Sequence, residues 1–168
     1  ILMYFEINVP SKIRKLMSKS LTENSTALTN YYKGMDYIEK AKTKDDLIQA
    51  KNNFITASEQ DINFAESIAQ LSITCDKLGF HHESDEYIQK AIHLAEEMGS
   101  ESSKAMVYNC AGILFKEGYK YDKAIPFFEK ALEIQIHLED QFMEAKILNN
   151  LAGCYSNKSN PDYAENLL

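Results

Sequence analysis

The stretch that decides the fold is Ala124-Ile-Pro-Phe-Phe-Glu-Lys-Ala131. The small residue Ala124 is followed four positions later by the large apolar Phe128, and three positions after that by Ala131. Apolar residues three and four apart lie on one face of a helix, so this skeleton predicts a helix with one packed face. The skeleton recurs at spacings of 34, 40 and 40 residues, at Ala50, Phe54 and Ala57, at Ser84, Ile88 and Ala91, and in part at Ala164 and Leu168.

A second skeleton lies twelve residues before each of these small residues, at Ile38, Ser72, Gly112 and Ala152. Three of these four residues are small, and they are flanked by residues of one apolar face: Gly34, Tyr37 and Ala41; Ile68, Leu71 and Cys75; Tyr108, Ala111 and Phe115; Leu148, Leu151 and Tyr155. Small residues let two antiparallel helices approach closely, and a large residue fills the hollow beside each. One such hairpin cannot bury its apolar stripe alone, so we expect the hairpins to stack.

Together the two skeletons resemble the tetratricopeptide pattern, Trp-x2-Leu-Gly-x2-Tyr followed by Ala-x3-Phe. The resemblance covers residues 30–168 and implies an all-α fold, a right-handed superhelix of helix-turn-helix repeats (an α-solenoid). It divides the chain into repeats at 31–64, 65–104 and 105–144, with an incomplete fourth at 145–168. Residues 1–29 do not fit the pattern. We expect them to be a linker or the end of a preceding helical domain in a longer protein, with a short basic helix over 11–21.

The turns are expected at Lys77–His82, Lys116–Lys120 and Asn157–Pro161, with Gly79 and Gly118 at the helix ends, where glycine permits a left-handed cap. Pro126 is expected in the first turn of a helix that begins near Ala124, a place where proline is tolerated.

Three segments carry a narrower resemblance: Tyr31–Met35, Ala65–Ala91 and Lys123–Leu132. They are similar to the repeat region of Rap-type response-regulator phosphatases, which belong to a group of Gram-positive bacterial sensors that bind short signalling peptides inside a repeat superhelix. The resemblance implies an oligopeptide ligand. Rap proteins place a helical bundle before their repeats, and that bundle acts on the response regulator. Only about thirty residues precede the repeats here, and the repeats are fewer, so phosphatase activity is not expected of this chain.

Charge and composition exclude several classes of function. A net charge of -7 and a pI near 5.1 argue against binding to nucleic acid or to anionic membranes, because phosphates require clustered positive charge. The short basic run Lys12–Lys19 is better explained as a solvated helix face. No run of about 18 apolar residues is present for a membrane span. The three cysteines (Cys75, Cys110 and Cys154) form no disulfide framework, which indicates a reducing cytoplasm.

Motifs for catalysis are also missing from the sequence. It contains no phosphate-binding loop and no recognisable acid–base pair of carboxylates. His81 and His82 are adjacent in an expected turn, and no cysteine or carboxylate pattern completes a metal set around them. We therefore expect no enzyme activity, no cofactor and no metal.

The candidate site is the inner groove of the repeat array, which the first helix of each hairpin lines in this fold. Its residues lie between the packing positions. They are Tyr32, Met35, Asp36 and Glu39; Glu66, Ala69, Gln70, Ile73 and Asp76; Met106, Asn109, Ile113 and Lys116; Asn149, Asn150, Gly153 and Ser156. Asn109 and Asn149 are equivalent, and an amide can bond a peptide backbone as donor and acceptor. The alternatives for these residues are a solvated surface or a bond to the neighbouring helix.

The sequence thus predicts a non-enzymatic module that binds a peptide or a partner protein. The alternative is a scaffold or sensory region of a larger signalling protein, whose output is a response-regulator phosphatase, a transcription factor or a kinase. The packing face of Tyr163–Leu168 has no following helix in the sequence, which predicts self-association through the C-terminal helix, or fraying there.

Overall fold

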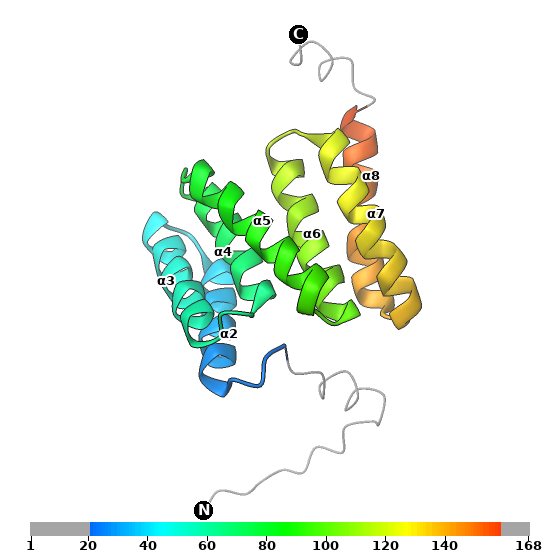
Figure 1. The fold of residues 1–168 in the computed structure, drawn as a ribbon. Coiled ribbons are helices and arrows are strands. Elements are labelled where there is room, and N and C mark those ends of the chain that lie inside the picture. Colours follow the sequence, from blue (N-terminus) through cyan, green and yellow to red (C-terminus); the bar gives the residue numbers. More distant parts are fainter. Residues whose placement is uncertain (1–20, 159–168) are drawn as a thin grey trace, which may run out of the picture.

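The computed structural model describes residues 21–158 of the chain (Figure 1). This part contains seven α-helices and no strand, which confirms the all-α fold class. The helices are α2 (Ser25–Lys40), α3 (Lys44–Gln60), α4 (Ala65–Lys77), α5 (His81–Met98), α6 (Glu101–Glu117), α7 (Tyr121–Leu138) and α8 (Gln141–Lys158). The sequence predictions for residues 1–20 and 159–168 lie outside the described residues.

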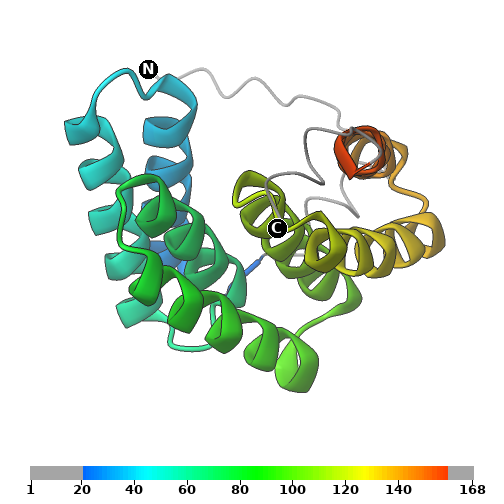
Figure 2. The ribbon, with the colours of Figure 1, turned by 90° about the horizontal axis from the view of Figure 1, so that it is seen from above.

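The helices pair in chain order as three hairpins, α2 with α3, α4 with α5 and α6 with α7, and α8 packs on α7. Each hairpin also contacts the next one, through α3 and α4 and through α5 and α6, while α4 contacts α6 directly. In Figure 2 the helices follow an arc, with α3, α5 and α7 on its outer side and α2, α4, α6 and α8 on its inner side.

Local signals explain where several helices begin. The Asn24 side chain accepts from the amides of Thr26 and Ala27 and caps α2. Thr43 and Asp46 form a reciprocal capping box at the start of α3, and Ser100 caps α6. These short polar side chains satisfy amides that have no partner within the helix.

The two skeletons meet across the hairpins, as the sequence predicted. In the third hairpin, a Cβ atom added to Gly112 would lie 2.6 Å from the ring of Phe128. In the second hairpin, the Ser72 hydroxyl donates to the Ser84 carbonyl at 2.8 Å. A side chain as small as glycine or serine is therefore required where each pair of helices crosses most closely.

The predicted register of the first hairpin is wrong by about one helical turn. Gly34, and not Ile38, lies against Phe54, with a Cβ position 2.6 Å from that ring. Gly34 is buried, whereas Ile38 is only half-buried. An extra turn of α2 follows Gly34 before the loop. Because four residues advance a helix by slightly more than one full turn, the packed face is kept and the sequence pattern does not reveal the shift.

Four local predictions also need correction. Helix α7 begins at Tyr121, so Pro126 lies in its second turn and not in its first. His81 and His82 open helix α5 and do not lie in the preceding turn. Gly79 has the left-handed conformation (φ 87°), but Gly118 does not. Tyr119 takes that conformation instead (φ 60°).

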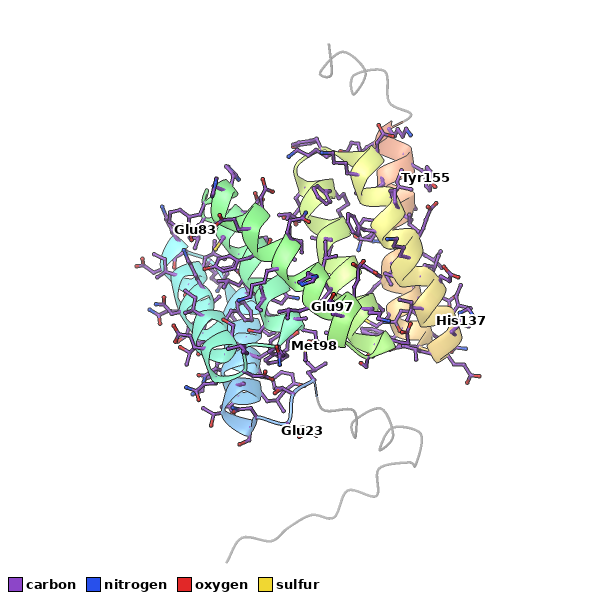
Figure 3. The ribbon with its side chains drawn as sticks, viewed as in Figure 1. Glu23, Glu83, Glu97, Met98, His137 and Tyr155 are labelled. Atoms are coloured by element: carbon purple, nitrogen blue, oxygen red, sulfur yellow. The ribbon has the colours of Figure 1, made fainter. Side chains whose placement is uncertain are left out.

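Three buried clusters form the core. One joins the first hairpin to α4, one joins the second hairpin to α6, and one joins the third hairpin to α8. All three cysteines are buried in them as free thiols, as expected for small apolar side chains. Four predicted packing residues lie outside this core, because Tyr37, Leu148 and Tyr155 are 37%, 46% and 48% exposed and Ala152 is exposed as well. Tyr155 lies at the surface of α8 (Figure 3). Its hydroxyl donates to the Glu129 carboxylate of α7.

Candidate binding surface on the inner helices

The predicted site residues come from α2, α4, α6 and α8, which are the inner helices of Figure 2. Most of them are partly or fully accessible. Those that are half-buried are Met35, Gln70, Asp76, Met106, Asn109, Ile113, Lys116, Asn150 and Gly153, and those that are exposed are Tyr32, Asp36, Glu39, Asn149 and Ser156.

Three α4 residues that were predicted to line the groove are buried. Glu66, Ala69 and Ile73 are 4%, 0% and 6% exposed. Ala69 and Ile73 belong to the cluster that joins α4 to α6, because these two inner helices pack directly on one another. Ile73 is therefore a core side chain in this structure, and the partly accessible predicted residues of α4 are Gln70 and Asp76.

Two polar contacts join neighbouring inner helices, and the residues that accept them lie at equivalent positions. The Gln70 amide donates to the Cys110 sulfur (3.4 Å) from α4 to α6, and the Lys116 ammonium donates to the Asn150 carbonyl oxygen (2.6 Å) from α6 to α8. Gln70, Cys110 and Asn150 are each separated by forty residues. This column of residues lies at the seams, so Asn150 has the neighbour-bonding role that the sequence left open as an alternative.

A second set of equivalent residues, each one position before Gln70, Cys110 and Asn150, has different polar contacts. It contains Ala69, Asn109 and Asn149. The Oδ1 atom of Asn109 is buried and has no hydrogen-bond partner in the described structure. Leaving a buried acceptor without a donor lowers the stability of the folded state by roughly 1–3 kcal/mol. A donor supplied by a ligand would remove this penalty at Asn109. Asn149 is exposed on α8.

Three buried titratable side chains lie on the first three inner helices: Tyr31 on α2, Glu66 on α4 and Cys110 on α6. Burial raises the pKa of Tyr31 on α2 far above its usual value, and the nearby Cys110 and Glu66 raise it further. Burial also raises the pKa of Glu66, although the helix amide and Ser103 oppose that shift. The pKa of Cys110 rises to about 12, mainly through burial. This thiol is therefore protonated at neutral pH and is no activated nucleophile.

A small cleft of about 270 Å³ lies where α4 and α6 begin. Its polar lining consists of Asp61, Asn63 and Glu66, Ser100 of the α5–α6 connection, and Ser102 and Ser103 of α6. Glu66 lies in the first turn of α4, a helix that has no capping side chain before it. A carboxylate there interacts favourably with the exposed helix amides, so this cleft has a structural explanation.

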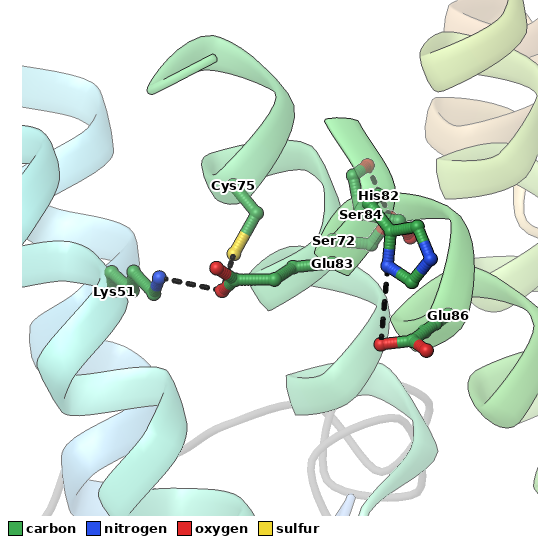
Figure 4. Close-up of polar contacts among 7 residues, drawn as sticks. All are labelled: Lys51, Ser72, Cys75, His82, Glu83, Ser84 and Glu86. Carbon is green, nitrogen blue, oxygen red and sulfur yellow. Dashed lines mark hydrogen bonds and ion pairs between the residues drawn. The ribbon is translucent and has the colours of Figure 1, made fainter. Parts of the chain in front are cut away.

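A second polar cluster lies on the outer side, between α3 and the second hairpin (Figure 4). Lys51 donates to the Glu83 carboxylate (2.8 Å) and lies 4.2 Å from the centre of the Phe80 ring. The Cys75 sulfur lies 4.0 Å from the same carboxylate. Burial raises the pKa of Cys75 to about 11, so the thiol stays protonated. The cluster holds the first two hairpins together.

Sequence reasoning missed the buried Gln135 on α7, which is 2% exposed and whose Oε1 atom has no partner in the described structure. Gln135 follows Ala95 of α5 by forty residues, so the repeat spacing could have identified it as a packing position. Among residues 21–158, no group of three or more His, Cys, Asp or Glu side chains is placed to hold a metal ion. None of the helices described here is both long enough and apolar enough to cross a membrane.

No protein-family model matches the chain, and no curated protein matches it.

Proposed function

We propose that this chain is a tetratricopeptide-type α-solenoid whose inner side binds an extended peptide, or an extended segment of a partner protein, without catalysing a reaction. The forty-residue recurrence of two complementary helix skeletons supports the family assignment. The narrower similarity to Rap-type proteins supports a role as the peptide-sensing part of a cytoplasmic regulator.

The observation that carries the proposal is the unpartnered Oδ1 atom of Asn109. An extended peptide presents a backbone N–H group at regular intervals, and each one is a neutral donor that does not depend on the peptide sequence. Asn149 offers a second amide at the equivalent position of the next inner helix. Lys116 lies between the two repeats and is held by Asn150, so a positive charge is available beside the amides.

The surface around Asn109 suits a peptide better than a metal or a small polar substrate. Met106 and Ile113 flank Asn109 on the same helix face and are both half-buried. Apolar surface beside an unpartnered amide oxygen favours a ligand that combines a polar backbone with apolar side chains.

The test begins with a random dodecapeptide library displayed on phage and selected against the full chain. The strongest peptide is synthesised, and its affinity is measured by calorimetry for the unchanged chain and for Asn109→Ala and Asn149→Ala. We expect each substitution to weaken binding by about tenfold, the value of one good hydrogen bond of about 1.4 kcal/mol. Asn52→Ala is the matched control, because Asn52 is an exposed amide on the outer helix α3.

Unchanged affinity in both inner variants would remove these residues as anchors. Equal weakening by the Asn52 variant would place the peptide elsewhere on the molecule.

A second candidate function is a scaffold or sensory region of a larger signalling protein, with a phosphatase, transcription factor or kinase as its output. The exposed apolar side chains of Phe142 and Leu148 on α8 favour it, because such a surface is an edge on which further helices pack.

A further inference from the structure

Two amide side chains of the third hairpin occupy positions that are alanine in the second hairpin. Asn109 of α6 follows Ala69 by forty residues, and Gln135 of α7 follows Ala95 by the same interval. Both alanines are fully buried and belong to one apolar cluster. Gln135 is 2% exposed, and in the described structure neither its Oε1 atom nor the Oδ1 atom of Asn109 has a hydrogen-bond partner. The third hairpin therefore has two unpartnered acceptors where the second has two methyl groups.

The register of the third hairpin brings the two amides close together. Gly112 of α6 lies against Phe128 of α7, and the two helices of this hairpin run antiparallel (Figure 1). Gln135 lies two turns further along α7, which places it opposite Ala105, two turns before Gly112 on α6. Asn109 is one turn from Ala105 on the same helix. The two amides are therefore separated by about one helical turn along the hairpin.

The seam between α6 and α8 gives access to these amides from the inner side. Asn109 is half-buried, so part of it is accessible. Lys116 lies two turns further along the same face of α6 and donates to Asn150 of α8, so this face is directed at the seam. Helix α8 contacts α6 less extensively than α4 does, and a side chain can therefore enter this seam with a smaller loss of packing.

Two unpartnered carbonyl oxygens suit a group that has two donors and no charge. Burying an ammonium or a guanidinium beside neutral oxygens leaves its charge unpaired, which is costly. A primary carboxamide is uncharged and has two N–H donors on one nitrogen.

We propose that Asn109 and Gln135 form a subsite for a carboxamide side chain, asparagine or glutamine, of the peptide that binds the inner side. The proposal rests on the proposed function and adds Gln135 as the residue that determines which peptides bind. The Oδ1 atom of Asn109 has two lone pairs, so it can accept from this side chain and from a backbone N–H group of the same peptide.

The subsite gives Gln135 opposite effects on stability and on binding. In the free chain its unpartnered Oε1 atom opposes folding, so Gln135→Met should raise the denaturation midpoint. The same substitution removes one acceptor of the subsite and should weaken peptide binding. A residue that only packs the seam would not separate the two effects, because a damaged fold weakens binding as well.

The test uses the full chain and the strongest dodecapeptide from the phage selection, in which we expect a carboxamide residue. Calorimetry compares the unchanged chain with Gln135→Met, each against the selected peptide and against peptides in which each asparagine is replaced by leucine or each glutamine by methionine. We expect Gln135→Met and loss of the recognised carboxamide each to weaken binding about tenfold. Together they should weaken it no more than either alone, because both remove the same contact.

Gln89→Met is the matched control, because Gln89 is exposed on the outer helix α5, and it should leave the affinity unchanged. Unchanged affinity in Gln135→Met, with weaker binding in Asn109→Ala, would overturn the subsite and leave the proposed function in place. Losses that multiply to about a hundredfold in the double change would also overturn it, since the carboxamide would then bind elsewhere.

A lower denaturation midpoint in Gln135→Met would contradict the subsite without any peptide, because the amide would then have a partner within the folded chain, such as a bound water molecule. A selection that yields no peptide would overturn both the subsite and the proposed function.

Discussion

The second hairpin (α4 and α5) and the third hairpin (α6 and α7) place equivalent residues forty positions apart but fill those positions differently. In the turn, Gly79 has φ 87° and Tyr119 has φ 60°, and in both turns the next amide donates to the carbonyl five residues before it (2.9 and 2.8 Å). The closest helix contact uses a serine pair in one hairpin and glycine with a phenyl ring in the other. The two hairpins therefore share their turn conformation and a close contact at the small residue of the first helix, and they do not share a particular chemistry.

Enlarging the glycine at the closest contact of the third hairpin should have the greatest effect on stability. We expect Gly112→Ala to lower the free energy of unfolding by about 1–3 kcal/mol, because its Cβ atom would overlap the buried ring of Phe128. Chemical denaturation measures the loss. Gly153→Ala on α8 is the matched control: nothing lies within 4 Å of its Cβ position, and the better helix former should stabilise the chain by about 0.5–1 kcal/mol. A loss of stability in both variants would show that the contact with Phe128 is not the cause.

The seam between α7 and α8 offers the next test. Gln135 occupies the place that Ala95 has in the second hairpin, and its buried Oε1 atom has no partner in the described structure. Gln135→Met keeps a long unbranched side chain and removes the polar group, so we expect the free energy of unfolding to rise by about 1 kcal/mol. A lower denaturation midpoint would instead mean that the amide contributes to the seam.

The turns give a similar effect through the backbone. Tyr119 is 71% exposed and holds a left-handed conformation that glycine adopts without strain. Tyr119→Gly should therefore stabilise the chain by about 1 kcal/mol, and Gly79→Ala should destabilise it by a similar amount. Thermal melts of the two variants would show shifts of opposite sign. Shifts of the same sign would contradict the equivalence of the two turns.

The smallest expected effect is a dependence on pH. Glu66 in the second hairpin is equivalent to Met106 in the third, and burial raises the pKa of the Glu66 carboxyl above its usual value of 4.5. The folded state therefore binds this proton more tightly than the unfolded state does. The contribution of Glu66 to stability is complete below pH 4.5 and is lost as the pH rises through the folded pKa.

Glu66→Gln should remove this dependence, so the variant should gain stability over the unchanged chain between pH 4 and pH 7. Denaturation curves at several pH values measure that difference. A constant difference across this range would show that the folded pKa of Glu66 is not raised.

Much of the fold was predictable from the spacing of small and large residues. Helix periodicity predicted the all-α class and the pairing of Gly112 with the helix that carries Phe128. The glycines at the helix ends predicted the turns near Gly79 and Gly118. The register of α2 was not predictable, because Gly34 and Ile38 lie on the same face one turn apart, and both choices satisfy the pattern.

The candidate site was predictable only as a set of positions. Spacing placed Gln70, Asn109, Asn149 and Asn150 on inner helices, but it could not tell which of them bond to a neighbour. That depends on how closely adjacent hairpins approach, which is a property of packing between repeats.

The spacing of small and large residues is enough to specify stacked helical hairpins, because its periods suit one face of an α-helix and no strand. Packing between the helices is what buries Ile73, brings Lys116 to Asn150, and leaves the Asn109 carbonyl oxygen without a donor. Local spacing sets a helix face, whereas burial and hydrogen bonding on that face depend on the distance and rotation of the neighbouring helices.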